Sequence, residues 1–368
     1  MLWIGAMLLA VHGLIHLMGF AKAFGYARLP QLTQPISREM GLLWLAAGIM
    51  LVGSAVTIVV RPRCLWIVGA VAIVISQAVI LSAWRDAWAG TVVNVILLLV
   101  VAHGWLTQGP PSFRAQFERD VAAGLAESVE APVVVTEGDL APLPEPVRRY
   151  VRATGAVGQP RVRNYRLRFR GRIRAGPDAR WMPFEADQQS FADPPTRLFL
   201  MRARMFGLPV EAFHRLIGGR ATMQVKIAGA IPMVDARGDV MDRSEAVTLF
   251  NDMCLLAPGT LLDPRIAWEP VDARAVRARF TSAEHTISAT LLFGDDSLLT
   301  NFISDDRSRS SPDGKVFTRL RFSTPVSDYR DFGSLRLAGH GEARWTLPEG
   351  EFTYGEFELQ DVAYNVRR

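Results

Sequence analysis

Four long apolar runs in the first 108 residues constrain this chain more than any other feature. They lie at residues 2–20, 41–60, 65–84 and about 91–107. Each approaches the ~20 residues with which an α-helix crosses ~30 Å of hydrocarbon. Tryptophans, whose indole rings favour the membrane interface, lie at or near the run ends: Trp44, Trp66, Trp84, Trp88 and Trp105. The pattern predicts a membrane α-helical bundle of four spans over residues 1–108 and excludes a wholly water-soluble protein.

The first run lacks the features of a cleaved signal peptide, because no positive charge precedes it and no small-residue cleavage site follows it. The preference for arginine over lysine is typical of a GC-rich bacterial genome. Basic residues are more numerous in the first and third loops than in the second, and this bias predicts that loops one and three are cytoplasmic. We therefore expect a multi-pass protein of the bacterial inner (cytoplasmic) membrane with an extracytoplasmic tail. The counted residues are Lys22, Arg28, Arg38 and Arg85 against Arg61 and Arg63.

Three histidines lie within the predicted spans. His12 and His16 are four residues apart and share a helix face, and His103 lies in the fourth run. Ionisable residues inside a membrane are candidates for function. One interpretation is that neutral imidazoles hydrogen-bond across helices and stabilise the bundle. The alternatives are ligation of a metal or haem iron by all three, or a role in proton or quinone chemistry.

The sequence changes character after the fourth run. Pro110 and Pro111 end that helix, and residues 109–160 form a proline-rich linker with short helices at 112–130 and 146–154. We expect the first of these helices to lie on the membrane surface. Gly155 is placed to terminate the second helix.

From residue 161 to 368 the apolar period becomes two, which predicts a β-rich soluble domain. Leu167, Phe169 and Ile173 alternate with arginines and should point inward. Short runs separated by turn residues predict a large curved antiparallel sheet, because the helices of a parallel sheet are missing. The runs are 161–174, 181–191, 196–205, 209–217, 220–228, 266–272, 274–281, 285–293, 297–304, 315–322, 341–347 and 351–366.

One helix, at about 242–257, interrupts the strands. Asp242 and Glu245 have the spacing of a capping box. The apolar stripe of this helix predicts that it lies across the concave face of the sheet. Phe250 and Met253 lie on that stripe and are the candidate ligand-cavity residues. The stripe comprises Val247, Phe250, Met253, Cys254 and Ala257.

No catalytic residue is predicted, because the chain lacks a nucleophile elbow, a P-loop, a GxGxxG and an HExxH motif. Cys64 and Cys254 lie in different regions and form no CxxC pair. Residues 235–238 are interpreted as a turn before the helix. The net charge of +5 is modest and interspersed, which argues against nucleic acid as a partner. Three tail histidines are interpreted as surface or satisfied core residues: His214, His285 and His340.

Several segments resemble an uncharacterised prokaryotic family, a domain of unknown function that often carries an N-terminal membrane anchor. They include WMPFEADQQSF (181–191), MVDARGDVMDRSE (233–245) and LLDPRIAWEPVD (261–272). The resemblance covers about 143–366, and HGLIHLMGFAKAFG (12–25) resembles a four-span module fused before that domain. It implies membership and no activity or site residue. The layout of sheet and helix is analogous to the half-barrel carriers of bacterial lipoprotein sorting, an analogy of fold alone.

Three hypotheses of function follow. In the first, the β-rich domain binds an apolar or amphipathic ligand such as membrane lipid. In the second, the chain is a membrane redox or metal protein that uses His12, His16 and His103. In the third, it is a non-enzymatic scaffold. No cofactor is predicted under the first and third hypotheses.

Overall fold

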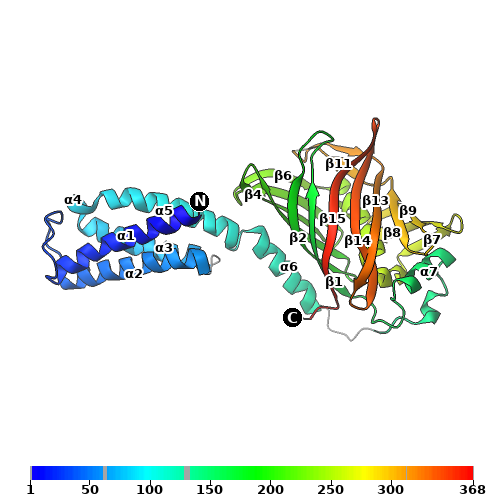
Figure 1. Ribbon diagram of the computed structural model, residues 1–368, viewed down its shortest axis with the longest axis horizontal. Helices are drawn as coiled ribbons and strands as arrows, with labels where there is room; N and C mark the ends of the chain where they lie inside the picture. Colours follow the sequence, from blue (N-terminus) through cyan, green and yellow to red (C-terminus); the bar gives the residue numbers. More distant parts are fainter. Residues whose placement is uncertain (1, 61–63, 128–132, 312, 368) are drawn as a thin grey trace. The chain divides into compact units, whose positions relative to one another are not determined.

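The computed structural model describes residues 2–60, 64–127, 133–311 and 313–367. The chain divides into two compact units, Met1–Gln116 and Phe117–Arg368, and each is considered by itself. The first unit is helical and the second is dominated by one sheet (Figure 1). Helix α6 (Phe113–Glu127) contains the boundary between them.

Four long helices and one short helix build the first unit. Its core takes Leu9, Leu51, Ala72 and Leu97 from the four long helices in turn, and each is almost completely buried. Apolar side chains such as Met7 and Leu99 point outward and are exposed. Such a surface is unusual for a protein surrounded by water. The helices are α1 (Leu2–Ala23), α2 (Arg38–Val60), α3 (Leu65–Ser82), α4 (Trp84–Ala87) and α5 (Ala89–Gln108).

Among the described residues, three helical segments are long and apolar enough to cross a membrane: Trp3–Ala23, Arg38–Thr57 and Ala89–Glu127. The predicted third span forms a helix whose apolar part, Trp66–Ser82, is shorter than the other three. The helical N-terminal region is therefore as predicted, with three candidate spans where the sequence predicts four.

The second unit contains the predicted large antiparallel sheet. Thirteen strands pair in the order β6-β5-β4-β3-β2-β1-β15-β14-β13-β10-β9-β8-β7, and every pairing is antiparallel. Two further short strands, β11 (Ser308–Ser310) and β12 (Phe317–Arg319), pair with each other. The strands of the sheet are β1 (Asn164–Ile173), β2 (Met182–Phe191), β3 (Thr196–Met205), β4 (Leu208–Ile217), β5 (Arg220–Ile227), β6 (Ile231–Arg237), β7 (Ile266–Pro270), β8 (Ala275–Ser282), β9 (His285–Phe293), β10 (Leu299–Ser304), β13 (Phe322–Phe332), β14 (Leu335–Leu347) and β15 (Gly350–Tyr364).

Two strands differ from the sequence prediction. Residues 235–237, interpreted as a turn, end strand β6, and the segment after residue 322 forms the long strand β13. Both strands contain a proline, Pro232 and Pro325, which weakens a strand signal in a sequence. The predicted alternation of β1 is present, because Leu167 and Phe169 are buried and Ile173 is half-buried. The arginines that alternate with them, Arg166, Arg168 and Arg170, are exposed.

Helix α8 (Asp239–Leu256) connects β6 to β7, the two edge strands of the sheet. A connection between opposite edges must cross a face of the sheet, and α8 contacts strands of both halves. Its last carbonyl groups accept hydrogen bonds from tyrosine hydroxyls. Tyr150 donates to the oxygen of Cys254 at 2.8 Å, and Tyr364 donates to that of Leu256. These bonds satisfy carbonyls that have no partner within a helix.

The predicted capping box of α8 does not form. The N-cap is Gly238, at φ 98°, and no side chain caps the helix. The Asp242 carboxylate instead accepts a hydrogen bond from the backbone N–H of Ala221 at 2.6 Å and a bond from Arg220 at 3.2 Å. Asp242, which the local sequence pattern predicts as the helix cap, therefore binds strand β5 instead.

The segment that the sequence presents as a linker contributes to the second unit. Helix α7 (Glu145–Ala153) buries Pro146, and its Val147, Tyr150 and Val151 belong to the core of the sheet domain. Gly155 follows at φ 76°, as expected for a helix terminator.

Candidate functional site

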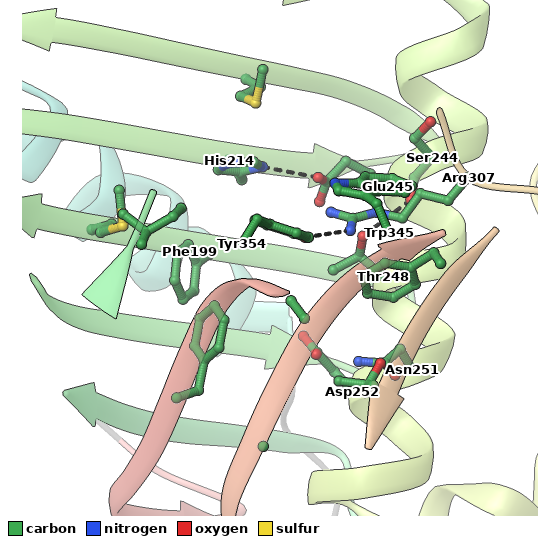
Figure 2. A pocket seen from close by; sticks show the side chains of 18 of the residues that line it. Phe199, His214, Ser244, Glu245, Thr248, Asn251, Asp252, Arg307, Trp345 and Tyr354 are labelled. Atoms are coloured by element: carbon green, nitrogen blue, oxygen red, sulfur yellow. Dashed lines mark hydrogen bonds and ion pairs between the residues drawn. The ribbon is translucent and has the colours of Figure 1, made fainter. Parts of the chain in front are cut away.

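A cavity of about 390 Å³ lies between α8 and the face of the sheet that this helix crosses. Its apolar wall is made largely of phenylalanine and methionine side chains (Figure 2). This volume falls within the range of about 300–1,000 Å³ for small-molecule sites. Apolar lining residues include Phe169, Phe199, Met201, Met223, Leu255, Trp345, Phe352 and Phe357.

The polar face of α8 lines this cavity. Ser244, Glu245, Thr248, Asn251 and Asp252 recur every three or four residues and therefore share one side of the helix. All five are buried. Polar groups are costly to bury without partners, so this face needs polar partners from the sheet or from a ligand.

The two residues predicted to line a cavity lie elsewhere on α8. Phe250 is fully buried, stacks on Phe280 with ring centroids 5.1 Å apart and meets Phe302 at 5.8 Å. Met253 is also buried in this core. Neither residue lines the 390 Å³ cavity. The apolar stripe of the helix is the packed face, and the opposite, polar face borders the cavity.

A buried arginine, Arg197, binds two carboxylates of the polar face of α8. Arg197 of β3 donates from Nε to Asp252 at 2.6 Å and from Nη1 to Glu245 at 3.2 Å. Gln188 donates to the same oxygen of Asp252 at 2.8 Å. His214 of β4 points toward Glu245, and its Nδ1 lies 2.9 Å from the carboxylate (Figure 2).

This arrangement keeps Glu245 ionised. Burial alone would raise the pKa of its carboxyl group. The charge and hydrogen bond of His214, with the charges of Arg197 and Arg307, outweigh burial and lower the pKa of Glu245 to about 2. The two carboxylates in turn raise the pKa of Arg197, although burial opposes its charge. We call Arg197, His214, Glu245 and Asp252 the cavity floor. The hydrogen bonds and ion pairs among their side chains hold these charged groups in place.

The rim of the cavity contains β11 and the residues that flank it. Arg307 to Ser311 are half-buried, and the backbone N–H of Ser308 donates to Ser244 Oγ of α8 at 3.1 Å. Arg307 donates from Nη1 to the hydroxyl of Tyr354 at 2.7 Å (Figure 2). The sequence interpretation included none of these rim residues.

The other histidines of the tail make structural contacts. His340 lies 2.6 Å from a carboxylate oxygen of Glu358, and the buried His285 lies 3.6 Å from Asp239. Two of the three tail histidines line the cavity: His214, beside Glu245, and His340, beside Glu358.

In the helical unit, the structure joins two of the three predicted histidines. His12 and His16 are buried, with ring centroids 4.6 Å apart. Nε2 of His12 lies 3.1 Å from Asn94 Oδ1, and Nε2 of His16 lies 3.0 Å from Ser76 Oγ. His103 is exposed on α5 and does not join this polar network.

No group of three or more His, Cys, Asp or Glu residues suited to a metal occurs in the part of the chain that the structure describes. The histidine pair instead has serine and asparagine partners, which the interpretation of hydrogen-bonding imidazoles requires.

The β-rich unit contains the decisive similarity. The pattern of DUF6544, a family of unknown function, matches residues 133–357. The chain belongs to DUF6544. The match begins before α7 and includes the whole cavity floor, so the site described above is a site of the family domain. A comparison with curated proteins finds no match.

Two solved structures show distant similarity. A DUF1329 protein from Desulfovibrio piger is 11% identical, with 64% of this chain and 95% of that chain covered and a TM-score of 0.36. A protein domain from Vibrio parahaemolyticus, described as outer-membrane lipoprotein-sorting, is 8% identical, with 55% and 86% covered and a TM-score of 0.33. At these scores neither similarity bears on the function of this chain.

Proposed function

We propose that the DUF6544 domain of this protein binds an amphipathic ligand in the cavity beside α8. The observation that carries the proposal is the buried polar face of α8, which lies against a wall of aromatic and methionine side chains. The polar face suits the polar group of an amphiphile, and the aromatic and methionine wall suits its apolar chain.

The apolar wall supplies the binding free energy. Burial of apolar ligand surface is favourable by roughly 25 cal/mol per Å². Methionine side chains are flexible and adapt to chains of different shape. Polar groups in such a cavity fix the orientation of the ligand and the end that enters first.

A membrane location fits a ligand of this kind. The outward apolar side chains of the helical unit and its three candidate spans support insertion into a bilayer. We include α3 as a fourth span, because Ala72 and Ile73 pack in the same bundle core as the other helices. We further propose the bacterial inner membrane and an extracytoplasmic tail, on the basis of the loop charges.

Ligand occupancy tests the proposal directly. The full chain, purified in an uncharged detergent, should retain a lipid-like molecule in native mass spectrometry. Met223→Trp places a larger side chain at the cavity wall and should reduce the retained fraction at least several-fold. Leu208→Trp is the matched control, because Leu208 is exposed and outside the cavity.

Equal retention by both variants would contradict binding at this cavity. Absence of any retained or added apolar ligand on the wild-type chain would contradict the proposal and favour the scaffold hypothesis. Haem or a metal in the wild-type spectrum would favour the second hypothesis instead.

A further inference from the structure

Three arginines at the rim of the cavity have no carboxylate within ion-pair distance among the described residues: Arg174, Arg307 and Arg309. Most other arginines of the sheet domain that line no cavity form such pairs, as Arg168 does with Asp361 and Arg172 with Glu356. We call the three rim arginines, which also line the cavity, the arginine cluster.

The charges of the cavity do not balance without another anion. Its lining contains four arginines and two carboxylates. Both carboxylates, Glu245 and Asp252, are already bound by Arg197, and Glu245 is also bound by His214. Arg307 interacts with Glu245 through its charge, at a distance longer than an ion pair. Nearby acids outside the lining are occupied as well: Asp306 pairs with Arg319, and Asp313 accepts a hydrogen bond from Ser311.

A row of aromatic rings brings the three guanidinium groups together. Phe322, Trp345 and Phe352 lie opposite one another on β13, β14 and β15. The Arg307 guanidinium lies 4.2 Å from the ring centroid of Phe322 and 5.2 Å from that of Trp345. Those of Arg174 and Arg309 lie 5.1 and 5.6 Å from Phe352. Cation–π contacts of this kind hold the cations in place without neutralising them.

The cluster also retains unused donors. Arg307 donates from Nη1 to Tyr354, but its Nε is buried and has no hydrogen-bond partner. Nη2 of Arg309 donates a hydrogen bond to the backbone oxygen of Ala175 at 3.1 Å. A buried donor without a partner is uncommon in folded proteins and calls for an acceptor. Guanidinium groups present forked donors that match carboxylate and phosphate oxygens.

We infer that the arginine cluster binds the anionic head group, a carboxylate or phosphate, of an amphiphile whose apolar chain lies in the cavity. This inference rests on the proposed function and specifies the chemistry of its ligand. The aromatic row continues into the Phe and Met wall, so a head group at the cluster places its chain directly in the apolar space. A cavity of about 390 Å³ near the lower end of the small-molecule range favours a single-chain amphiphile.

Competition between matched ligands tests the head group. The full chain in nanodiscs of uncharged net composition should bind a dansylated undecanoate, with empty nanodiscs as the blank. Dodecanoate and dodecyl phosphate should displace it at concentrations at least tenfold lower than dodecanol, which has the same chain length and no charge. Inorganic phosphate should not displace it.

Two variants test whether the arginine cluster causes the preference for an anionic head group. Arg309→Gln and Arg307→Gln should each reduce the preference for dodecanoate over dodecanol at least threefold. Arg277→Gln is the control, because Arg277 is exposed on β8 and outside the lining. An unchanged melting temperature of Arg309→Gln shows that the readout reports binding rather than folding.

The outcomes separate this inference from the proposed function. Displacement by dodecanol as strong as by dodecanoate would overturn the anionic head group and leave amphiphile binding intact. Displacement by inorganic phosphate at the concentration of dodecyl phosphate would show a free-anion site and also overturn the inference. Failure of every chain-bearing probe to bind would contradict the proposed function itself.

Discussion

Arg197 illustrates how one residue stabilises the site. Its side chain is 7% exposed and pairs with the side chains of Glu245 and Asp252, which are 1% and 8% exposed. Removing one member of such a group leaves the others as uncompensated buried charges, and the cost greatly exceeds that of a surface pair. The group therefore fixes α8 against β3.

Arg197→Met should lower the free energy of unfolding by about 3–5 kcal/mol. Arg202→Met is the matched control on the same strand, because Arg202 forms a half-exposed pair with Asp187 that is worth about 1 kcal/mol or less. Denaturant unfolding of the full chain in detergent measures both. Equal losses in the two variants would show that the buried group has no special role.

The carboxylate of Glu245 makes stability depend on acid pH. Its pKa in the folded chain is about 2, below the ordinary value of 4.5. A depressed carboxyl pKa contributes stability that is complete above the unfolded pKa and is lost as pH falls through the folded pKa. The contribution is on the order of 3 kcal/mol and should disappear between about pH 5 and 2.

Glu245→Gln should therefore lower stability at pH 7 and flatten the fall of the melting temperature below pH 5. Glu269→Gln, at an exposed strand position, should leave the profile unchanged. The melting temperature of the full chain at several pH values provides the measurement. A Glu245→Gln profile that is parallel to that of the wild type would contradict the assignment.

At the scale of the element, one face of α8 packs in the core and the other face lines the cavity. Phe250 packs between Phe280 and Phe302. Thr248 borders the cavity, and its hydroxyl donates to the Ser244 carbonyl of the same helix. Phe250→Ala should cost about 3–5 kcal/mol, as expected for a large core residue. Thr248→Ala should cost about 1 kcal/mol or less. Chemical denaturation distinguishes them, and a Phe250→Ala variant as stable as the wild type would be incompatible with this packing.

The sequence predicted the existence of α8 and of its apolar stripe, but it assigned the cavity to the wrong face. Apolar periodicity identifies the side of a helix that is buried, and an amphipathic helix normally turns its polar side to water. In this fold the edge-to-edge connection buries both sides. The partners of the polar side come from elements that are distant in the sequence, among them Arg197 on β3, His214 on β4 and Thr324 on β13.

In the strands, too, features set by neighbouring residues were predictable from the sequence, and contacts between distant residues were not. Alternation in β1 identified Leu167 and Phe169 as inward residues, because a period of two is a property of the strand itself. The arginine cluster takes its members from residue 174 and residues 307–309, which are far apart in the chain. Their convergence depends on the registers of β13, β14 and β15, which a single sequence does not reveal.

At the scale of the whole molecule, the orientation of the bundle decides which compartment the ligand site faces. The first unit ends at Gln116, so a reporter fused there follows a complete set of helices. Basic residues near spans are retained in the cytoplasm, and their bias favours loops one and three on that side. The proposed orientation places the tail, and the ligand site with it, outside the cytoplasm.

Alkaline phosphatase, which is active only outside the cytoplasm, should therefore be active when fused after Gln116 and inactive when fused within the first loop. A green fluorescent protein exported in unfolded form should give the opposite pattern. Replacing three basic residues of loop one with glutamine should weaken the bias and yield mixed activity at Gln116, because loop two then carries the larger share of positive charge. The residues are Lys22, Arg28 and Arg38. Fluorescence without phosphatase activity at Gln116 in the unaltered chain would place the tail in the cytoplasm and reverse the proposed orientation.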